Sequence, residues 1–175
     1  MKRYGIWVLG FLAFPLAGIL GGLAGPVDDA GSALLGGALT GLVLGIGQSL
    51  ASLGALPPAR WVPATVLGTA AGLALGAAAV GYRTGLADLA LMGLITGVPL
   101  GVAQAVALPA GTRARIAWAL AVPVLWALGW TVTTLVGVDV EARYTIFGST
   151  GAVTVSVLSG LLLLPLLRKA PRWTT

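Results

Sequence analysis

Six apolar stretches, each near the length that crosses a membrane, leave few folds open to this sequence. They are expected over residues 5–26, 32–56, 61–81, 87–109, 116–138 and 145–167. A helix needs roughly 20 apolar residues to cross about 30 Å of hydrocarbon. Only 9% of the 175 residues are charged, whereas a soluble domain carries about 25%. We therefore predict an all-α integral membrane bundle of six transmembrane helices, in one domain over residues 1–175.

The charged residues between these stretches alternate in sign along the chain. All five acidic residues lie in or beside the first, third and fifth gaps, and eight of the ten basic residues lie in the other gaps and at both ends. Loops rich in Lys and Arg stay in the cytoplasm during insertion. We therefore predict a multi-pass protein with cytoplasmic N- and C-termini. Arg83 and Arg143 are the two basic residues that fall on the outer side.

The composition argues against several kinds of function. The chain has no Cys and no His, and therefore lacks the side chains that usually hold haem or zinc. Its net charge of +5 is spread thinly rather than clustered on one face, which argues against nucleic acid as a partner. No nucleophile stands near a base, so we expect no catalytic residue, no cofactor and no metal site. We expect the protein not to be an enzyme.

A motif of small residues recurs three times at one spacing. In two copies, glycines at every fourth residue precede a glutamine, and the third copy has small or polar substitutes: Gly37, Gly41, Gly45 and Gln48; Gly93, Gly97, Gly101 and Gln104; Gly148, Ala152, Ser156 and Ser159. The copies divide the chain into hairpins of roughly 1–57, 58–112 and 113–175 that all start on the inner side. Such parallel repeats predict a pseudo-threefold axis along the membrane normal.

Aromatic and glycine residues support the same division. Trp7, Trp61 and Trp118 each stand near the inner start of a hairpin, where an interfacial aromatic residue is expected. Glycines four residues apart form a helix face without side chains, which lets two backbones approach closely. We assign helix packing to three such ladders, while a pathway along their grooves is the alternative: Gly37, Gly41 and Gly45; Gly68, Gly72 and Gly76; Gly93, Gly97 and Gly101.

Two glutamines are the most informative polar residues inside the predicted spans. Gln48 and Gln104 lie in the inner third of their helices, and Ser159 is their counterpart in the third hairpin. An amide in hydrocarbon needs partners for its donors and its acceptor. These residues could therefore bond neighbouring helices together. Alternatively, they could form a polar ring near the axis that contacts a solute, an ion or a lipid headgroup.

The outer gaps supply a second candidate site, for a cation or for a protein partner. Carboxylates that meet at the ends of three hairpins could bind a cation through oxygen ligands, or could simply pair with the two outer arginines. Residues 138–144 are the most polar outer stretch, and we expect any outer ligand or partner to bind there. The candidate residues are Asp28, Asp29, Asp88, Asp139, Glu141, Arg83 and Arg143.

The segment from Gly41 to Gly76 resembles a group of small bacterial polytopic membrane proteins of uncharacterised activity. Their repeats combine Gly-x-x-x-Gly-x-x-Gln with a short basic loop, a Trp and a glycine-rich helix. The second hairpin follows this plan with Gln104, Arg115 and Trp118, whereas Ser159 departs from it. The resemblance implies a protein of the bacterial cytoplasmic membrane and no established activity.

Two functions from different classes fit these patterns. The first is a non-enzymatic accessory or scaffold protein that acts by helix packing within the lipid bilayer, with a membrane protein partner or as a homo-oligomer. The second is transport or binding of a small solute or cation through the axial polar site. The direction in which Gln48 and Gln104 point distinguishes the two.

Overall fold

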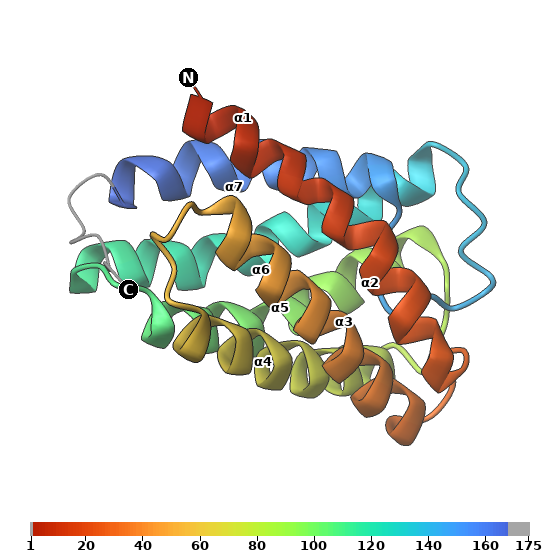
Figure 1. Cartoon of the computed structure of the whole chain (residues 1–175). Coiled ribbons are helices and arrows are strands. Elements are labelled where there is room, and N and C mark those ends of the chain that lie inside the picture. Colours follow the sequence, from red (N-terminus) through yellow and green to blue (C-terminus); the bar gives the residue numbers. More distant parts are fainter. Residues whose placement is uncertain (1, 168–175) are drawn as a thin grey trace.

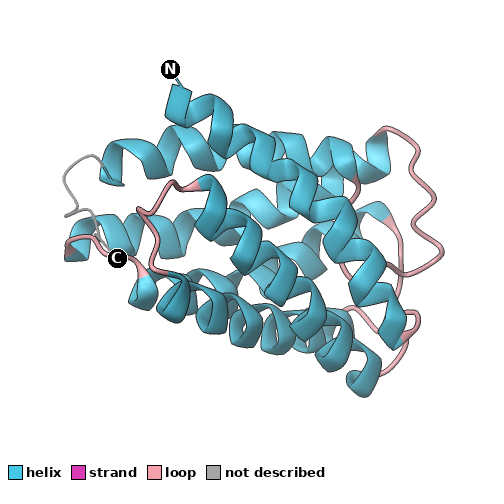
Figure 2. Ribbon diagram, viewed as in Figure 1, coloured by secondary structure: helices cyan, strands magenta, loops and turns pink. Residues whose placement is uncertain are grey.

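The structure, a computed structural model, describes residues 2–167, and their side chains as far as residue 163 (Figure 1). All regular structure within these residues is helical (Figure 2), which confirms the all-α prediction for this part of the chain. The helices are α1 (Lys2–Leu9), η1 (Gly10–Leu12), α2 (Ala13–Gly21), η2 (Gly22–Ala24), α3 (Ala30–Ala51), α4 (Pro58–Ala79), α5 (Leu86–Ala107), α6 (Thr112–Leu135) and α7 (Ser149–Leu167).

Five of the six predicted spans are confirmed as helical segments long and apolar enough to cross a membrane. They are the joined helices Lys2–Ala24 and the helices α3 to α6. The sixth is α7, whose stretch Ser149–Leu163 is apolar but shorter. It begins four residues later than the predicted start at 145, because residues 145–147 take another conformation described below.

The helices are arranged as a closed ring. Each of α3, α4, α5 and α6 packs along the next, α2 packs on α3, and α7 lies between α6 and α1 (Figure 1). Connections alternate between the two ends of the bundle, and the start of α1 and the end of α7 lie at the same end. Since consecutive helices are antiparallel, the predicted hairpin order is followed throughout the described residues.

This alternation separates the charged residues. The N-terminal start of α1 and the loops at 52–57 and 108–111 lie at one end, with Arg60 and Arg113 beside them. The loops at 25–29, 80–85 and 136–148 lie at the other end and carry the acidic residues. Arg168, Lys169 and Arg172, predicted to lie on the inner side, fall outside the described residues.

The first span is not a continuous α-helix, because proline interrupts it. Pro15 has no N–H to donate to the carbonyl of Phe11, and its ring crowds that carbonyl. The short 3₁₀ turn Gly10–Leu12 occupies this position between α1 and α2. As a result α1 packs chiefly on α7, and α2 packs chiefly on α3.

The glycine ladders lie in the interfaces between neighbouring helices. A Cβ added to Gly41 would lie 2.7 Å from the Thr65 carbonyl oxygen of α4, and one on Gly76 would lie 2.6 Å from the Met92 carbonyl oxygen of α5. Close approaches of the same kind occur between α3 and α4, α4 and α5, and α5 and α6, at Gly37, Gly45, Gly68, Gly72, Gly93, Gly97 and Gly101. These nine glycines therefore face partners within the same chain.

The last connection folds back into the bundle. Thr145, Ile146 and Phe147 are buried to 1–4% exposure although they are not helical. The Phe147 ring lies 5.3 Å from that of Phe14 and 5.4 Å from that of Trp126, between centroids. An apolar ring buried this way explains why α7 starts only at residue 149, since the chain must first leave this pocket.

Candidate functional site

A chain of hydrogen bonds joins the two glutamines to two tryptophans in the half of the bundle nearer the loops at 52–57 and 108–111. The Gln48 Oε1 accepts from the Trp61 Nε1–H at 2.9 Å and from the Gln104 Nε2 at 3.2 Å. The Gln104 Nε2 also donates to the Thr65 Oγ1 at 3.0 Å, and its Oε1 accepts from the Trp118 Nε1–H at 3.1 Å. These donors fix which way each amide points, because an indole N–H can only donate.

Helices α1 and α7 form a third contact of this kind. The Trp7 Nε1–H donates to the Ser159 Oγ at 3.1 Å, and that hydroxyl donates onward to the Ser156 carbonyl at 3.3 Å. Each of the three tryptophans thus donates to a polar residue on the neighbouring helix that comes before its own in the ring. These polar residues are the three that the repeat pattern makes equivalent, Gln48, Gln104 and Ser159. The structure therefore brings Gln48 and Gln104 into direct contact and places Ser159 on a separate branch.

The three tryptophans were expected at the membrane interface, and the structure shows that their side chains face the interior of the bundle. Trp7, Trp61 and Trp118 are exposed by only 0–3%. The rings of Trp61 and Trp118 lie 6.1 Å apart between centroids. A buried indole N–H needs a partner, and the glutamines and Ser159 provide one for each tryptophan. Sequence reasoning found the repeated Trp and the repeated Gln but did not pair them.

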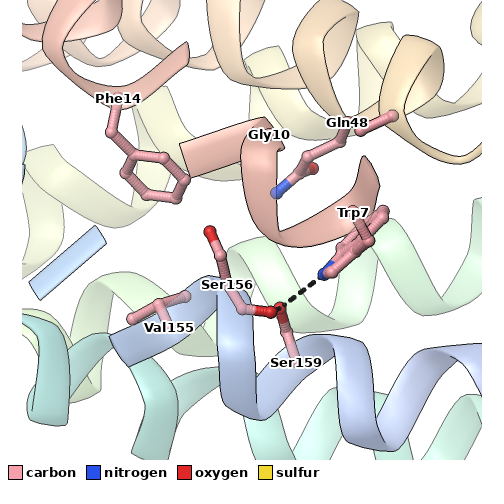
Figure 3. A pocket seen from close by; sticks show the side chains of 8 residues that line it. Trp7, Gly10, Phe14, Gln48, Val155, Ser156 and Ser159 are labelled. Atoms are coloured by element: carbon pink, nitrogen blue, oxygen red, sulfur yellow. Dashed lines mark hydrogen bonds between the residues drawn. The ribbon is translucent and has the colours of Figure 1, made fainter. Parts of the chain in front are cut away.

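A narrow cavity separates Gln48 from the serines of α7 (Figure 3). Its volume is about 10 Å³ and its lining includes Trp7, Gln48, Ser156 and Ser159. Its shape leaves room for about one water molecule. The Gln48 Nε2 lies on the cavity side in Figure 3, and makes no hydrogen bond within the described part of the chain.

The chemistry available at this centre is neutral. Amides, indoles and hydroxyls exchange hydrogen bonds, and none of them titrates near neutral pH. The network can therefore fix helices or bind a small polar molecule. It contains no general base that could activate the hydroxyl of Ser156 or Ser159.

The outer candidate residues are divided among separate local contacts. The Arg83 Nη2 lies 2.7 Å from the Asp88 Oδ1 in a largely exposed ion pair, and this hydrogen bond raises the pKa of Arg83. Asp29 caps α3 by accepting the Ser32 N–H at 2.8 Å. Hydrogen bonds from the backbone of Ser32, and then of Gly31, lower the pKa of Asp29.

The long outer loop ties the three outer connections together. The Thr84 Oγ1 donates to the Glu141 Oε1 at 2.8 Å, and the Val27 N–H donates to the Arg143 carbonyl at 3.0 Å. Asp139 accepts the Glu141 N–H at 3.0 Å. The acidic residues do not converge: within the described residues, no group of three carboxylates is placed to hold a metal ion.

Residues 141–144, within the outer stretch 138–144, border an outer hollow. It has a volume of about 540 Å³ and lies between the end of the first span, at Gly22 and Pro26, and residues 141–145. Arg143 adopts a left-handed backbone with φ of 53°, and its side chain forms no ion pair with any described residue. This hollow is therefore open, mixed in charge and bordered by an unpaired guanidinium.

Sequence reasoning missed the buried part of this loop. Thr145 shares a hydrogen bond of 2.8 Å with Thr40 of α3, and both side chains are buried. The sequence pattern placed residues 145–147 inside the sixth span. The only local signal was the unusually long polar stretch before them.

The chain matches no protein-family model, no curated protein and no solved structure.

Proposed function

We propose that this chain is a non-enzymatic accessory or scaffold protein of the bacterial cytoplasmic membrane. In this proposal both termini lie in the cytoplasm, and the three hairpins are related by a pseudo-threefold axis. The separation of basic and acidic ends supports the orientation. The three matched tryptophan contacts, on Gln48, Gln104 and Ser159, support the symmetry.

The observation that supports the scaffold function is the hydrogen-bonded polar centre. Gln48 and Gln104 bond each other and two buried indoles, so four helices are joined through their side chains or through those of Trp61 and Trp118. Hydrogen bonds between helices in lipid contribute about 0.6–1.7 kcal/mol each. Together with the close glycine contacts they favour a rigid bundle, which suits a protein whose role is to hold a partner in place.

The partner surface in this proposal is the outer hollow bordered by residues 141–145. The nine ladder glycines already face neighbouring helices of the same chain, so a partner would have to bind elsewhere. The outer hollow presents the Arg143 side chain together with Glu141. We therefore propose a membrane protein partner with an acidic or polar outer segment that reaches Arg143.

Native purification with intact mass spectrometry tests the scaffold function. We expect a stoichiometric protein partner with the native chain and its loss with Arg143→Ala. Arg83→Ala is the matched control, because Arg83 is an outer arginine that already pairs with Asp88. If the native chain is instead a homo-oligomer that Arg143→Ala dissociates, the partner in this proposal is a second copy of the chain. A monomer without any partner would refute it.

The orientation has a separate test, since the chain contains no Cys. Ala59, at the start of α4, and Ala142, in the connection between α6 and α7, lie at opposite ends of the bundle and can each be replaced by a single cysteine. An impermeant thiol reagent applied to intact cells should label Ala142→Cys and spare Ala59→Cys. The reverse result would refute the orientation.

The alternative function is binding or transport of a small solute or cation at the axial site. The cavity beside Gln48 favours it, because the amide Nε2 offers donors without a described partner. Solute and cation flux into liposomes tests it, comparing the native chain with Gln48→Leu plus Gln104→Leu. Flux that the double substitution abolishes would favour transport over the scaffold function.

A further inference from the structure

The repeat leaves one position of the polar centre unfilled. Gln104 on α5 donates to Gln48 on α3. By the same repeat, Gln48 would donate to residue 159 on α7 if that residue were a glutamine. A serine there is shorter than a glutamine and cannot reach back to Gln48. Its hydroxyl is already engaged, accepting from Trp7 and donating to the Ser156 carbonyl. The narrow cavity lies in the space between Gln48 and Ser159.

The free polar groups of this cavity come from opposite walls. The Gln48 Nε2 supplies two N–H donors on the α3 side, and its orientation is fixed because Oε1 accepts from Trp61 and Gln104. The Ser156 Oγ lies on the α7 side and makes no hydrogen bond within residues 2–163. Ser156 is only 5% exposed.

We infer that the cavity binds one water molecule in place of the missing third glutamine amide. The water accepts from the Gln48 Nε2 and exchanges a hydrogen bond with the Ser156 Oγ. Cavities that stay dry are apolar, whereas a polar cavity of this size with two or more partners holds an ordered water. The inference rests on these contacts and not on the proposed scaffold function. Residue 159 then determines whether the polar centre of the bundle contains a water molecule.

The side-chain amides offer a direct measurement. The chain contains two Gln and no Asn, so the only side-chain amide NMR signals come from Gln48 and Gln104. We expect a cross-peak between the Gln48 amide protons and water. Gln104 is the internal control, since its Nε2 already donates to Gln48 and to Thr65, and its protons should show no such cross-peak. Absence of the cross-peak at Gln48 in the native protein would overturn the inference.

Substitutions at residue 159 extend the test. Ser159→Gln should displace the water, so the Gln48 cross-peak disappears while the thermal midpoint rises. Ser159→Ala is the matched control: it removes the acceptor for Trp7 but leaves the cavity open, so the cross-peak should persist while the midpoint falls. A cross-peak that survives in Ser159→Gln would place the water elsewhere and would also overturn the inference. The comparison of the two native glutamines stands even if Ser159→Gln does not fold.

Discussion

Gly41 marks the closest approach to α4 among the three ladder glycines of α3, so one added methyl group measures how tightly these two helices pack. In Gly41→Ala the new Cβ would lie 2.7 Å from the Thr65 carbonyl oxygen and 2.8 Å from the Val66 Cα. Ordinary van der Waals contact begins near 3.4 Å, so α3 and α4 must separate by about 0.7 Å. Both obstructing atoms belong to the backbone and cannot rotate away.

Two effects of opposite sign set the size of the change. Alanine is a better helix former than glycine by about 1 kcal/mol in water. Forcing an extra methyl group into a packed interface costs about 1–3 kcal/mol, and the upper part of that range applies where backbone must move. We therefore expect a net loss of about 1–2 kcal/mol, which lowers the thermal midpoint by about 2–8 °C for a chain of this size.

The assay is thermal unfolding in detergent, followed by tryptophan fluorescence. Gly5→Ala is the matched control, because the same chemical change on α1 places a Cβ with nothing within 4 Å. It should leave the midpoint unchanged or raise it slightly through helix propensity. If Gly41→Ala has the same thermal midpoint as Gly5→Ala, the glycine ladder is not needed for the close packing of α3 on α4, and the prediction is refuted.

Three further predictions concern the loop, the cap and the polar centre. Phe147→Ala should lower the free energy of unfolding by about 3–5 kcal/mol by emptying an aromatic pocket, and should expose the outer loop to proteases. Tyr144→Ala is the control, because this residue is exposed and its substitution should have neither effect. Equal protease resistance of the two variants would contradict the prediction. The pKa of Asp29 is lower than its ordinary value of 3.8, so its stabilising effect is present above that pH and is lost as the pH falls below it. The thermal midpoint should therefore fall more steeply in acid for the native chain than for Asp29→Asn, and parallel curves would refute this. Gln104→Leu leaves the Trp118 indole without its acceptor and should lower the free energy of unfolding by about 1–2 kcal/mol. The same thermal unfolding assay measures this, and an unchanged thermal midpoint would show that the hydrogen-bond network does not stabilise the fold.

The polar centre illustrates a limit of reasoning from sequence. The spacing of Gln48 and Gln104 after their glycines was visible in the chain, and so was the recurrence of Trp61 and Trp118. Their pairing was not, because each hydrogen bond joins residues at least 13 positions apart. Hydropathy also placed the tryptophans at the membrane interface, since a Trp near a helix end is usually found there. Only the position of the neighbouring helix shows that each indole turns inwards.

The outer loop illustrates a second limit. Apolar composition alone made residues 145–147 part of the sixth helix. In the structure Phe147 packs against Phe14, Trp126 and Trp130 instead. Burial of a large ring against three others outweighs the extension of α7 by one turn. The energy that decides this conformation comes from residues distant in the sequence.

The sequence by itself determined the all-helical class, the positions of five long apolar helices and the sorting of charge between the two ends. These properties depend on local composition and period, because a backbone in lipid must satisfy its hydrogen bonds within its own helix. Tertiary structure alone decided the closure of the ring, the direction of each indole and amide, the folded-back loop and the cavity at Ser159. These depend on which side chains meet across helices, which the order of residues along one helix does not specify.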